Sequence, residues 1–268
     1  MDHKIVEQLA RDWRTAGVTE GDTLLVHSSL SRTMRRVTAM GGEATPDLVM
    51  KSFLEVLGES GTLLLPLFNF GFARGAAFDI RNTPSQMGAL TEAGRLWPGV
   101  IRTGHPIYSF GIIGRHAHLF RGLKNVSGFG ADSPFGILHR LNGKIGVIDL
   151  PDRISMTFYH YVEECFGTPY RYHKMFAGEY TDDHGVVSEE RFSFFVRDLE
   201  QGVVSLLDPM GEILWKKGLY SGFRPQEGCG LRVIPASSLF DEVTTVLKEN
   251  RARGLLYDIQ PADIRQTG

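Results

Sequence analysis

The segment from Lys144 to Gly167 constrains the fold most, because it joins a buried strand, a short connection and a helix. Residues 144–150 form a short apolar run, Pro151 follows it, and residues 155–166 form an apolar-rich stretch that ends at Gly167. A short apolar run bounded by turn residues is typical of a buried strand. A strand followed closely by a helix presents side chains at the strand's carboxyl end. The segment therefore predicts an α/β fold.

One face of this predicted helix carries groups suited to acid–base chemistry. Thr157, His160 and Glu163 recur every three residues and so share a face, and Glu164 lies one turn beyond His160. A carboxylate beside an imidazole holds its tautomer and stabilises its cation, which is how a general base is built. The alternative is a buried histidine that hydrogen-bonds a carboxylate for structural reasons, and this segment alone does not decide between the two.

The overall composition excludes several classes of protein. The 268 residues are 42% hydrophobic and 22% charged, as in ordinary soluble globular proteins. A formal net charge of −2 gives no general attraction to nucleic acid or to anionic membranes. The N-terminus has no signal-peptide pattern, and no apolar stretch approaches the ~20 residues of a spanning helix. We therefore expect a cytoplasmic protein without nucleic-acid or membrane partners.

Cysteine and histidine usage predicts neither a disulfide framework nor a metal site. The two cysteines, Cys165 and Cys229, lie in different sequence contexts. The nine histidines show no ligand spacing with cysteines or carboxylates. We therefore expect chemistry that uses no metal.

Alternating helix and strand patterns extend the α/β prediction over the first two thirds of the chain. Helical patterns cover residues 5–13, 45–57, 87–96 and 134–141, and strand patterns cover residues 22–27, 61–68 and 107–113, with a loop at 71–82. His105 precedes Pro106, which holds it extended, so its ring could point into a cleft or simply be solvated.

The strand at 22–27 runs directly into a turn of small hydroxyl residues, Ser28, Ser29, Leu30 and Ser31. Such a turn at a strand's carboxyl end leaves backbone N–H groups available to a phosphate or an acyl oxygen. Serine also caps helices, so a structural role is the alternative.

The character of the chain changes after Gly167. Residues 179–197 alternate as strands do, and strand-like pieces continue over residues 211–217 and 232–234. A final amphipathic helix is predicted over residues 236–253, and no linker is long enough to separate independent domains. We expect a single domain over residues 1–268, with a β-rich portion at 170–234 on the same core.

Six short motifs occur in an order that resembles a known family. They are His27-Ser28-Ser29-Leu30, Gly41-Gly42-Glu43-Ala44-Thr45, Gly61-Thr62, His105-Pro106 with Ser109, Ser133-Pro134, and Thr157-x-x-His160-Tyr161-x-Glu163. Together they resemble the aminoglycoside 3-N-acetyltransferase family, which has the antibiotic N-acetyltransferase fold. The resemblance runs from roughly Ile5 to Leu247, and it is carried by the combination, because no single motif is specific.

The resemblance implies an αβα sandwich with a β-rich C-terminal portion, acetyl-CoA or another acyl-CoA as co-substrate, and a primary amine of a sugar as acceptor. His160 matches the family's catalytic histidine, and Glu163 matches the carboxylate one turn on. The turn from Ser28 to Ser31 matches the segment near the CoA pantetheine and pyrophosphate. Ser133 and Thr157 are then further candidate contacts.

This reaction needs a base and an oxyanion site. A sugar ammonium must lose a proton before it attacks a thioester, and the neutral imidazole of His160 can accept it near neutral pH. Donors for the oxygen of the tetrahedral intermediate are the backbone N–H groups of the 28–31 turn or the Thr157 hydroxyl, and the sequence does not choose between them. No cysteine lies in the motif, so we expect direct transfer in a ternary complex.

Basic residues favour an anionic acceptor. Aminoglycosides are polycations and favour carboxylate-lined clefts, and many family members that modify them carry Asp or Asn where this chain has Ile154. Arginine suits phosphate. The basic residues around the motif are Arg153, Arg171 and Lys174, and those in the later strands are Arg224 and Arg232. We therefore expect a nucleotide-linked amino sugar used for surface polysaccharide. Its candidate contacts are His105, Tyr170, Arg171 and Lys174.

Three other functions stay open at this point. The chain could be an aminoglycoside 3-N-acetyltransferase that confers antibiotic resistance. It could be an acyl-CoA thioester hydrolase in which His160 activates water. It could also be a non-catalytic protein that binds a sugar or CoA, and the sequence leaves open whether it forms a homo-oligomer.

Overall fold

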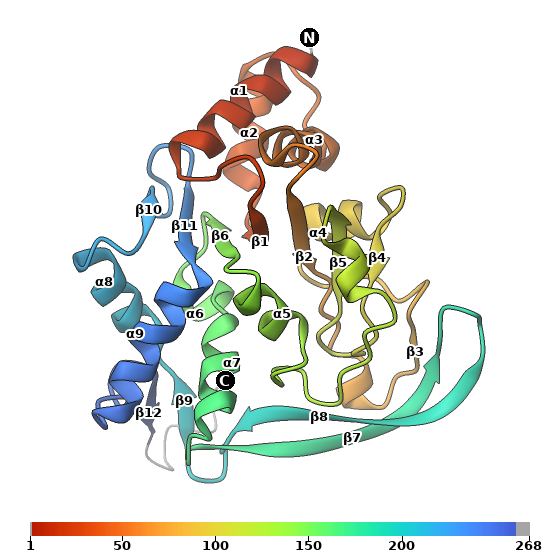
Figure 1. Cartoon of the computed structure of the whole chain (residues 1–268), viewed down its shortest axis with the longest axis vertical. Helices are drawn as coiled ribbons and strands as arrows, with labels where there is room; N and C mark the ends of the chain where they lie inside the picture. The colour runs from red at the N-terminus through yellow and green to blue at the C-terminus, as the bar shows by residue number, and fades with distance from the viewer. Residues whose placement is uncertain (1, 261–268) are drawn as a thin grey trace.

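The computed structural model describes residues 2–260, and at its centre lies a seven-stranded sheet with the order β10-β11-β6-β1-β2-β5-β4 (Figure 1). The three central strands are parallel, and the outer strands run antiparallel to their neighbours. Their bounds are β1 (Thr23–Ser28), β2 (Thr62–Pro66), β4 (Ile101–Arg102), β5 (Phe110–Gly114), β6 (Lys144–Ile148), β10 (Ser221–Gly222) and β11 (Leu231–Pro235).

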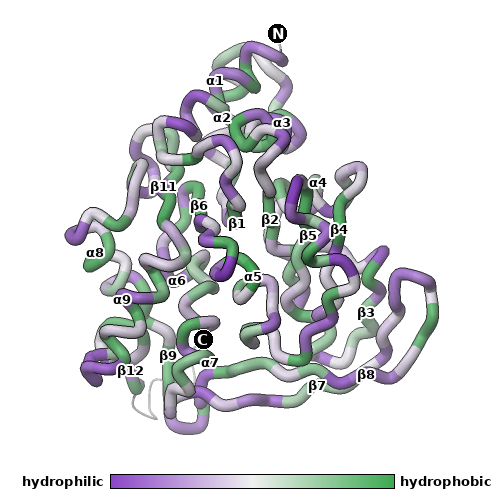
Figure 2. Tube along the Cα trace, viewed as in Figure 1, coloured by the Kyte–Doolittle hydropathy of each residue, from purple (hydrophilic) through white to green (hydrophobic). Residues whose placement is uncertain are grey.

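Helices cover both faces of this sheet. Successive residues of a strand point to opposite faces, so Leu24 and Val26 pack in one buried cluster while Leu25 packs in the other. The first cluster includes α1 (Asp2–Thr15), α2 (Ser31–Ala39), α3 (Pro46–Leu57) and α4 (Ala89–Arg95), and the second includes α5 (Pro134–Arg140), α7 (Phe158–Phe166), α8 (Asp208–Lys216) and α9 (Ala236–Lys248). The expected αβα sandwich is confirmed, and hydrophobic residues gather along its central strands (Figure 2).

A long hairpin crosses one end of the sheet, below it in Figure 1. Its strands, β7 (Arg171–Thr181) and β8 (Val187–Arg197), pair antiparallel along their whole length, and β3 (Phe78–Asp79) joins β7 in parallel. Tyr180 and Phe192 belong to the second buried cluster of the sandwich. The hairpin therefore shares a core with the sandwich, and the single domain over residues 1–268 stays a prediction. The remaining short elements are β9 (Val203–Ser205) paired with β12 (Tyr257–Ile259), α6 (Asp152–Ser155), η1 (Phe72–Arg74) and η2 (Ala117–Phe120).

Two predictions of local structure were wrong. Residues 211–216 are not strand-like but lie in α8, and Lys217 is its C-cap. Pro209 occupies the first turn of this helix, and Met210 and Leu214 bury one face. The helix predicted over 155–166 begins later, at Phe158 in α7, because Ser155 ends the separate short helix α6 and the chain bends at Met156 and Thr157. No helix within residues 2–260 is long and apolar enough to cross a bilayer.

Candidate active site

Helix α7 places His160 and Glu163 in direct contact, as the three-residue spacing predicts. His160 Nδ1 lies 2.7 Å from Glu163 Oε2. The histidine side chain is 16% exposed, whereas the glutamate is fully buried. When Nδ1–H donates to the carboxylate, the lone pair lies on Nε2, which is the tautomer that a general base needs. The predicted contact is confirmed.

Two residues from the start of the β7 hairpin hold Glu163 in place. The Tyr170 hydroxyl donates to Glu163 Oε1 at 2.9 Å, and Arg171 Nε lies 2.7 Å from Oε2 in an ion pair. Tyr170 is buried, stacks on Tyr257 and lines neither of the cavities described below. The prediction that Tyr170 contacts the acceptor was therefore wrong, because its hydroxyl is used by the buried carboxylate.

The charges around this pair fix their protonation. Burial lowers the pKa of His160, the Arg171 guanidinium lowers it further, and Glu163 opposes both. Burial by itself would raise the pKa of Glu163, but Arg171 and His160 more than offset it, so the pKa of this carboxyl is lowered. Near neutral pH the site therefore holds a neutral imidazole beside a charged carboxylate.

His160 lines a cavity of about 420 Å³ between α7 and the hairpin. Aromatic side chains, among them Tyr172, Phe176 and Phe194, form part of its wall. Its other charged side chains are all basic: Arg153, Arg171, Lys174 and Arg197. We call it the His160 cavity.

The four basic side chains are not equally available. Arg171 is paired with Glu163, and Arg153 is paired with Asp208. Within residues 2–260, no ion pair joins Lys174 or Arg197 to a carboxylate. These two exposed cations are therefore the ones that can meet an anionic ligand.

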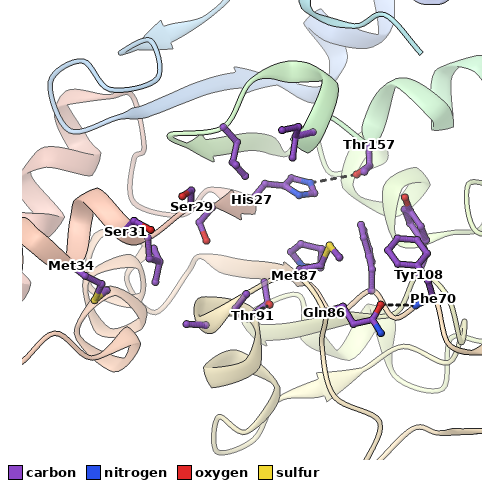
Figure 3. Close-up of a pocket in the computed structure, with 18 residues that line it drawn as sticks. His27, Ser29, Ser31, Met34, Phe70, Gln86, Met87, Thr91, Tyr108 and Thr157 are labelled. Atoms are coloured by element: carbon purple, nitrogen blue, oxygen red, sulfur yellow. Dashed lines mark hydrogen bonds between the residues drawn. The ribbon is translucent and has the colours of Figure 1, made fainter. Parts of the chain in front are cut away.

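The turn from Ser28 to Ser31 lines a larger cavity, of about 750 Å³, at the carboxyl end of β1 (Figure 3). We call it the Ser28–31 cavity. The backbone N–H of Ser29 is already bonded to the Ile148 carbonyl, which leaves the N–H groups of Leu30 and Ser31, at the start of α2, as candidate donors. His27 and Thr157 lie on its wall, with His27 Nε2 3.4 Å from the Thr157 hydroxyl. Burial, and then the nearby Arg232 cation, lower the pKa of His27 to about 3, so this ring stays neutral.

Tyr108 lines both cavities, so it marks the place where they meet. Its ring stacks on Phe68, with centroids 3.8 Å apart, and lies against Phe194 at 4.7 Å. The first turn of α7 spans the same boundary, because Thr157 lines one cavity and His160 the other. Sequence reasoning missed Tyr108, and the only signal was its position inside the motif that begins at His105.

His105 and Ser133 lie away from both cavities, contrary to prediction. The His105 ring is fully buried, where its Nδ1 accepts the Tyr108 N–H at 3.0 Å and its Nε2 lies 3.2 Å from the Ser193 carbonyl. Burial lowers the pKa of His105 to about 4. Ser133 is fully buried as the N-cap of α5, where its hydroxyl accepts the Gly136 N–H. His105 therefore anchors Tyr108, and Ser133 closes a helix end.

Two of the arginines expected to attract an anionic acceptor are already neutralised. Arg232 is 1% exposed and donates to Asp152 Oδ1 at 2.8 Å. Arg224 forms a two-pronged pair with Glu212. The electrostatic argument was therefore wrong for these two, because Asp152, 80 residues away, pairs with Arg232, and Glu212, 12 residues away, pairs with Arg224. Within residues 2–260 there is also no cluster of three acidic, histidine or cysteine residues that could hold a metal ion.

Comparisons with known proteins identify the family of this chain. Residues 25–202 match the family model described as aminoglycoside 3-N-acetyltransferase. The chain is 28% identical over 183 residues to aminoglycoside N(3)-acetyltransferase VII of Streptomyces paromomycinus, an alignment that covers 60% of this chain and 61% of that relative's length.

Two solved structures show the same fold. Aminoglycoside acetyltransferase AAC(3)-Xa superposes with a TM-score of 0.75 at 22% identity, covering 91% of this chain and 92% of that one. A binary complex of AAC-IIIb with CoASH superposes with a TM-score of 0.74 at 20% identity, covering 91% and 96%. From the family match over 25–202, we conclude that this chain belongs to the aminoglycoside 3-N-acetyltransferase family.

Proposed function

We propose that this protein is an N-acyltransferase that moves an acetyl or related acyl group from CoA to a primary amine of an amino sugar. One observation carries the proposal: the two cavities meet at Tyr108, and the His160–Glu163 pair lines one while the Ser28–Ser31 turn lines the other. Family membership supplies the reaction class. We place the reaction in the cytoplasm, where acyl-CoA is available.

The Ser28–31 cavity suits the acyl-CoA donor. Its wall includes apolar side chains such as Phe70 and Leu150, which suit the pantetheine arm. The start of α2 presents unpaired backbone N–H groups and a positive dipole end, which suit the pyrophosphate. The binary complex of AAC-IIIb with CoASH supports this choice of donor.

His160 then acts as the general base. Its Nε2 removes a proton from the sugar ammonium, and the freed amine nitrogen attacks the thioester carbonyl carbon. The C–N bond forms, and the carbonyl re-forms as the C–S bond of the tetrahedral intermediate breaks. The nitrogen loses two protons in all: one passes through the His160 imidazolium to the departing thiolate, and the other is released to solvent. Glu163 stabilises the imidazolium while it exists. The Thr157 hydroxyl receives the oxyanion, because the N–H groups of Leu30 and Ser31 face the pyrophosphate.

The His160 cavity favours an acceptor that carries negative charge. Two of the cations that line it, Lys174 and Arg197, have no ion pair within residues 2–260, so a polycationic aminoglycoside meets repulsion there. The diphosphate of a nucleotide-linked amino sugar can pair with Lys174 and Arg197. We therefore propose such a sugar, of the kind used to build surface polysaccharide, as the acceptor. The name of the matched family favours the second candidate, an aminoglycoside.

An acceptor panel tests this proposal. The purified protein is given acetyl-CoA with nucleotide-linked amino sugars, with aminoglycosides, or with no amine, and release of free thiol is measured. We expect thiol release only with the nucleotide-linked sugars. Turnover with aminoglycosides alone would overturn the acceptor assignment, and release without any amine would indicate a thioester hydrolase.

A variant that removes one positive charge from the His160 cavity tests whether this cavity binds the acceptor. Lys174→Gln should raise the KM for the nucleotide-linked sugar and leave the KM for acetyl-CoA unchanged, since Lys174 lines only the His160 cavity of the two. Lys51→Gln, an exposed lysine on α3, is the matched control and should change neither constant.

A further inference from the structure

A separate cavity of about 260 Å³ lies at the outer edge of the large sheet, beside edge strand β4. It shares no lining residue with the Ser28–31 cavity or the His160 cavity. Four of its lining residues are arginines: Arg81, Arg95, Arg102 and Arg121. We call it the arginine cavity, and none of the residues assigned above to the acyl transfer lines it.

Arg102 is a largely buried cation that forms no ion pair with a carboxylate among residues 2–260. Its Nη1 donates to the carbonyls of Ile80 and Thr83, at 3.1 and 2.6 Å, and its Nε donates to the Ser109 hydroxyl at 3.1 Å. Its Nη2 is buried and has no hydrogen-bond partner within residues 2–260. Burial, and then the Arg95 cation, lower the pKa of Arg102 to about 10. No ion pair within residues 2–260 neutralises this charge, so an anion in the cavity would be attracted to Arg102.

The other arginines leave a surplus of positive charge. Arg81 is paired with Asp79, and Arg95 with Glu92, and these carboxylates hold both guanidinium groups in place. The Arg121 side chain is exposed and makes no ion pair in the part of the chain that the structure describes. The one acidic residue in the lining, Asp183, is 71% exposed and lies near His184 instead.

We propose that the arginine cavity binds a phosphate group, either free phosphate or the phosphate of a small monoester. Guanidinium groups present planar pairs of N–H donors that match the tetrahedral oxygens of phosphate, and several of them can bond one dianion at once. The volume of about 260 Å³ is below the range of drug-sized ligand sites and suits a small anion. The bound anion accepts hydrogen bonds from the exposed Arg121 guanidinium and neutralises the charge surplus of Arg102 and Arg121.

Titration calorimetry with inorganic phosphate, at an ionic strength held constant with sodium chloride, tests the site on the full chain. We expect saturable binding by the wild type and about tenfold weaker binding by Arg121→Gln, which loses one charge-assisted contact. Arg14→Gln, an exposed arginine on α1 outside the cavity, is the matched control and should bind like the wild type. Arg121 is chosen because Arg102 also holds the 80–83 turn, so its variants could fail to fold.

Equal phosphate binding by all three proteins, or no saturable binding by the wild type, would overturn the proposal. The arginines would then only hold the 80–83 turn in place.

A second set of titrations identifies the source of the phosphate. Saturating dephospho-CoA fills the donor site without supplying a 3′-phosphate, and we expect it to leave phosphate binding unchanged. If complete CoA displaces phosphate, the donor's own 3′-phosphate reaches the arginine cavity; if it does not, the ligand is free phosphate or another monoester. Displacement by dephospho-CoA as well would place the phosphate in the donor site and overturn the proposal.

Discussion

Two buried carboxylates beside α7 are surrounded by the same kinds of groups and yet differ in chemistry. Glu163 accepts a tyrosine hydroxyl and pairs with an arginine. Asp152 accepts two tyrosine hydroxyls, at 2.9 and 2.7 Å, and also pairs with an arginine. The partners are Tyr170 and Arg171 for the first, and Tyr159, Tyr220 and Arg232 for the second.

The two networks differ because only the Glu163 network includes a titratable side chain that lines a cavity of the candidate active site. Glu163 also bonds His160, which lines the His160 cavity, whereas the partners of Asp152 line neither cavity of the candidate active site. The pKa of Asp152 is raised, because burial outweighs Arg232 and the tyrosines, while the pKa of Glu163 is lowered. A buried carboxylate network is therefore a structural device by itself, and it becomes a reactive site where it supports an imidazole that a ligand can reach.

The largest expected effect is on turnover. Replacing His160 with Gln removes the base and should lower kcat by about 10²- to 10⁴-fold, with CoA binding and the circular dichroism spectrum unchanged. His118→Gln, an exposed histidine on η2, is the control and should retain full activity. If the His160 variant keeps wild-type turnover, the Glu163 network is structural, as the Asp152 network is, and does not take part in catalysis.

Breaking the Asp152 network should instead cost stability. Asp152→Ala leaves Arg232 buried without its partner, so we expect the free energy of unfolding to fall by about 3–5 kcal/mol in denaturant titrations. The exposed carboxylate of the Glu212–Arg224 pair is the comparison, and Glu212→Ala should cost about 0–1 kcal/mol. Activity per folded molecule should stay near the wild-type level in both variants. If Asp152→Ala loses as much turnover as the His160 variant, the Asp152 network is not purely structural.

The pH profile tests how Glu163 acts on His160. The carboxylate favours the imidazolium and so opposes the lowering of the His160 pKa by burial and Arg171. Glu163→Gln removes that support, so the His160 pKa falls further, and the acid limb of kcat/KM, where protonation of His160 stops catalysis, moves to lower pH. Glu164→Gln, whose carboxylate bonds Ser127, should leave the limb in place. A shift to higher pH in Glu163→Gln would contradict this account.

The smallest effect concerns a buried polar contact that carries no charge. Ser133→Ala removes the N-cap of α5 and should lower the free energy of unfolding by about 0.5–2 kcal/mol. The KM for acetyl-CoA should stay unchanged, because Ser133 lines neither cavity of the site. A raised KM without a stability loss would restore Ser133 as a donor contact.

Local sequence patterns determined the parts of this protein that depend on near neighbours. The three-residue spacing on a helix placed His160 against Glu163, and the small residues after β1 predicted the turn that lines the Ser28–31 cavity. Apolar periodicity and helix caps located most of the sandwich, although the strand-like pattern at 211–217 proved to be a helix. These features succeed because the hydrogen bonds and side-chain spacing of a helix or strand are set within a few residues.

The tertiary structure alone decided which side chains reach a cavity. Tyr108 joins the two cavities through packing on Phe68 and Phe194, which lie 40 and more residues away in sequence. The charge of Arg232 is neutralised by Asp152, which lies on a distant segment of the chain. His105 is buried against the carbonyl of Ser193. The exposure of a side chain and its charge partners depend on which segments fold against each other. They therefore cannot be predicted from the residues next to it in the chain.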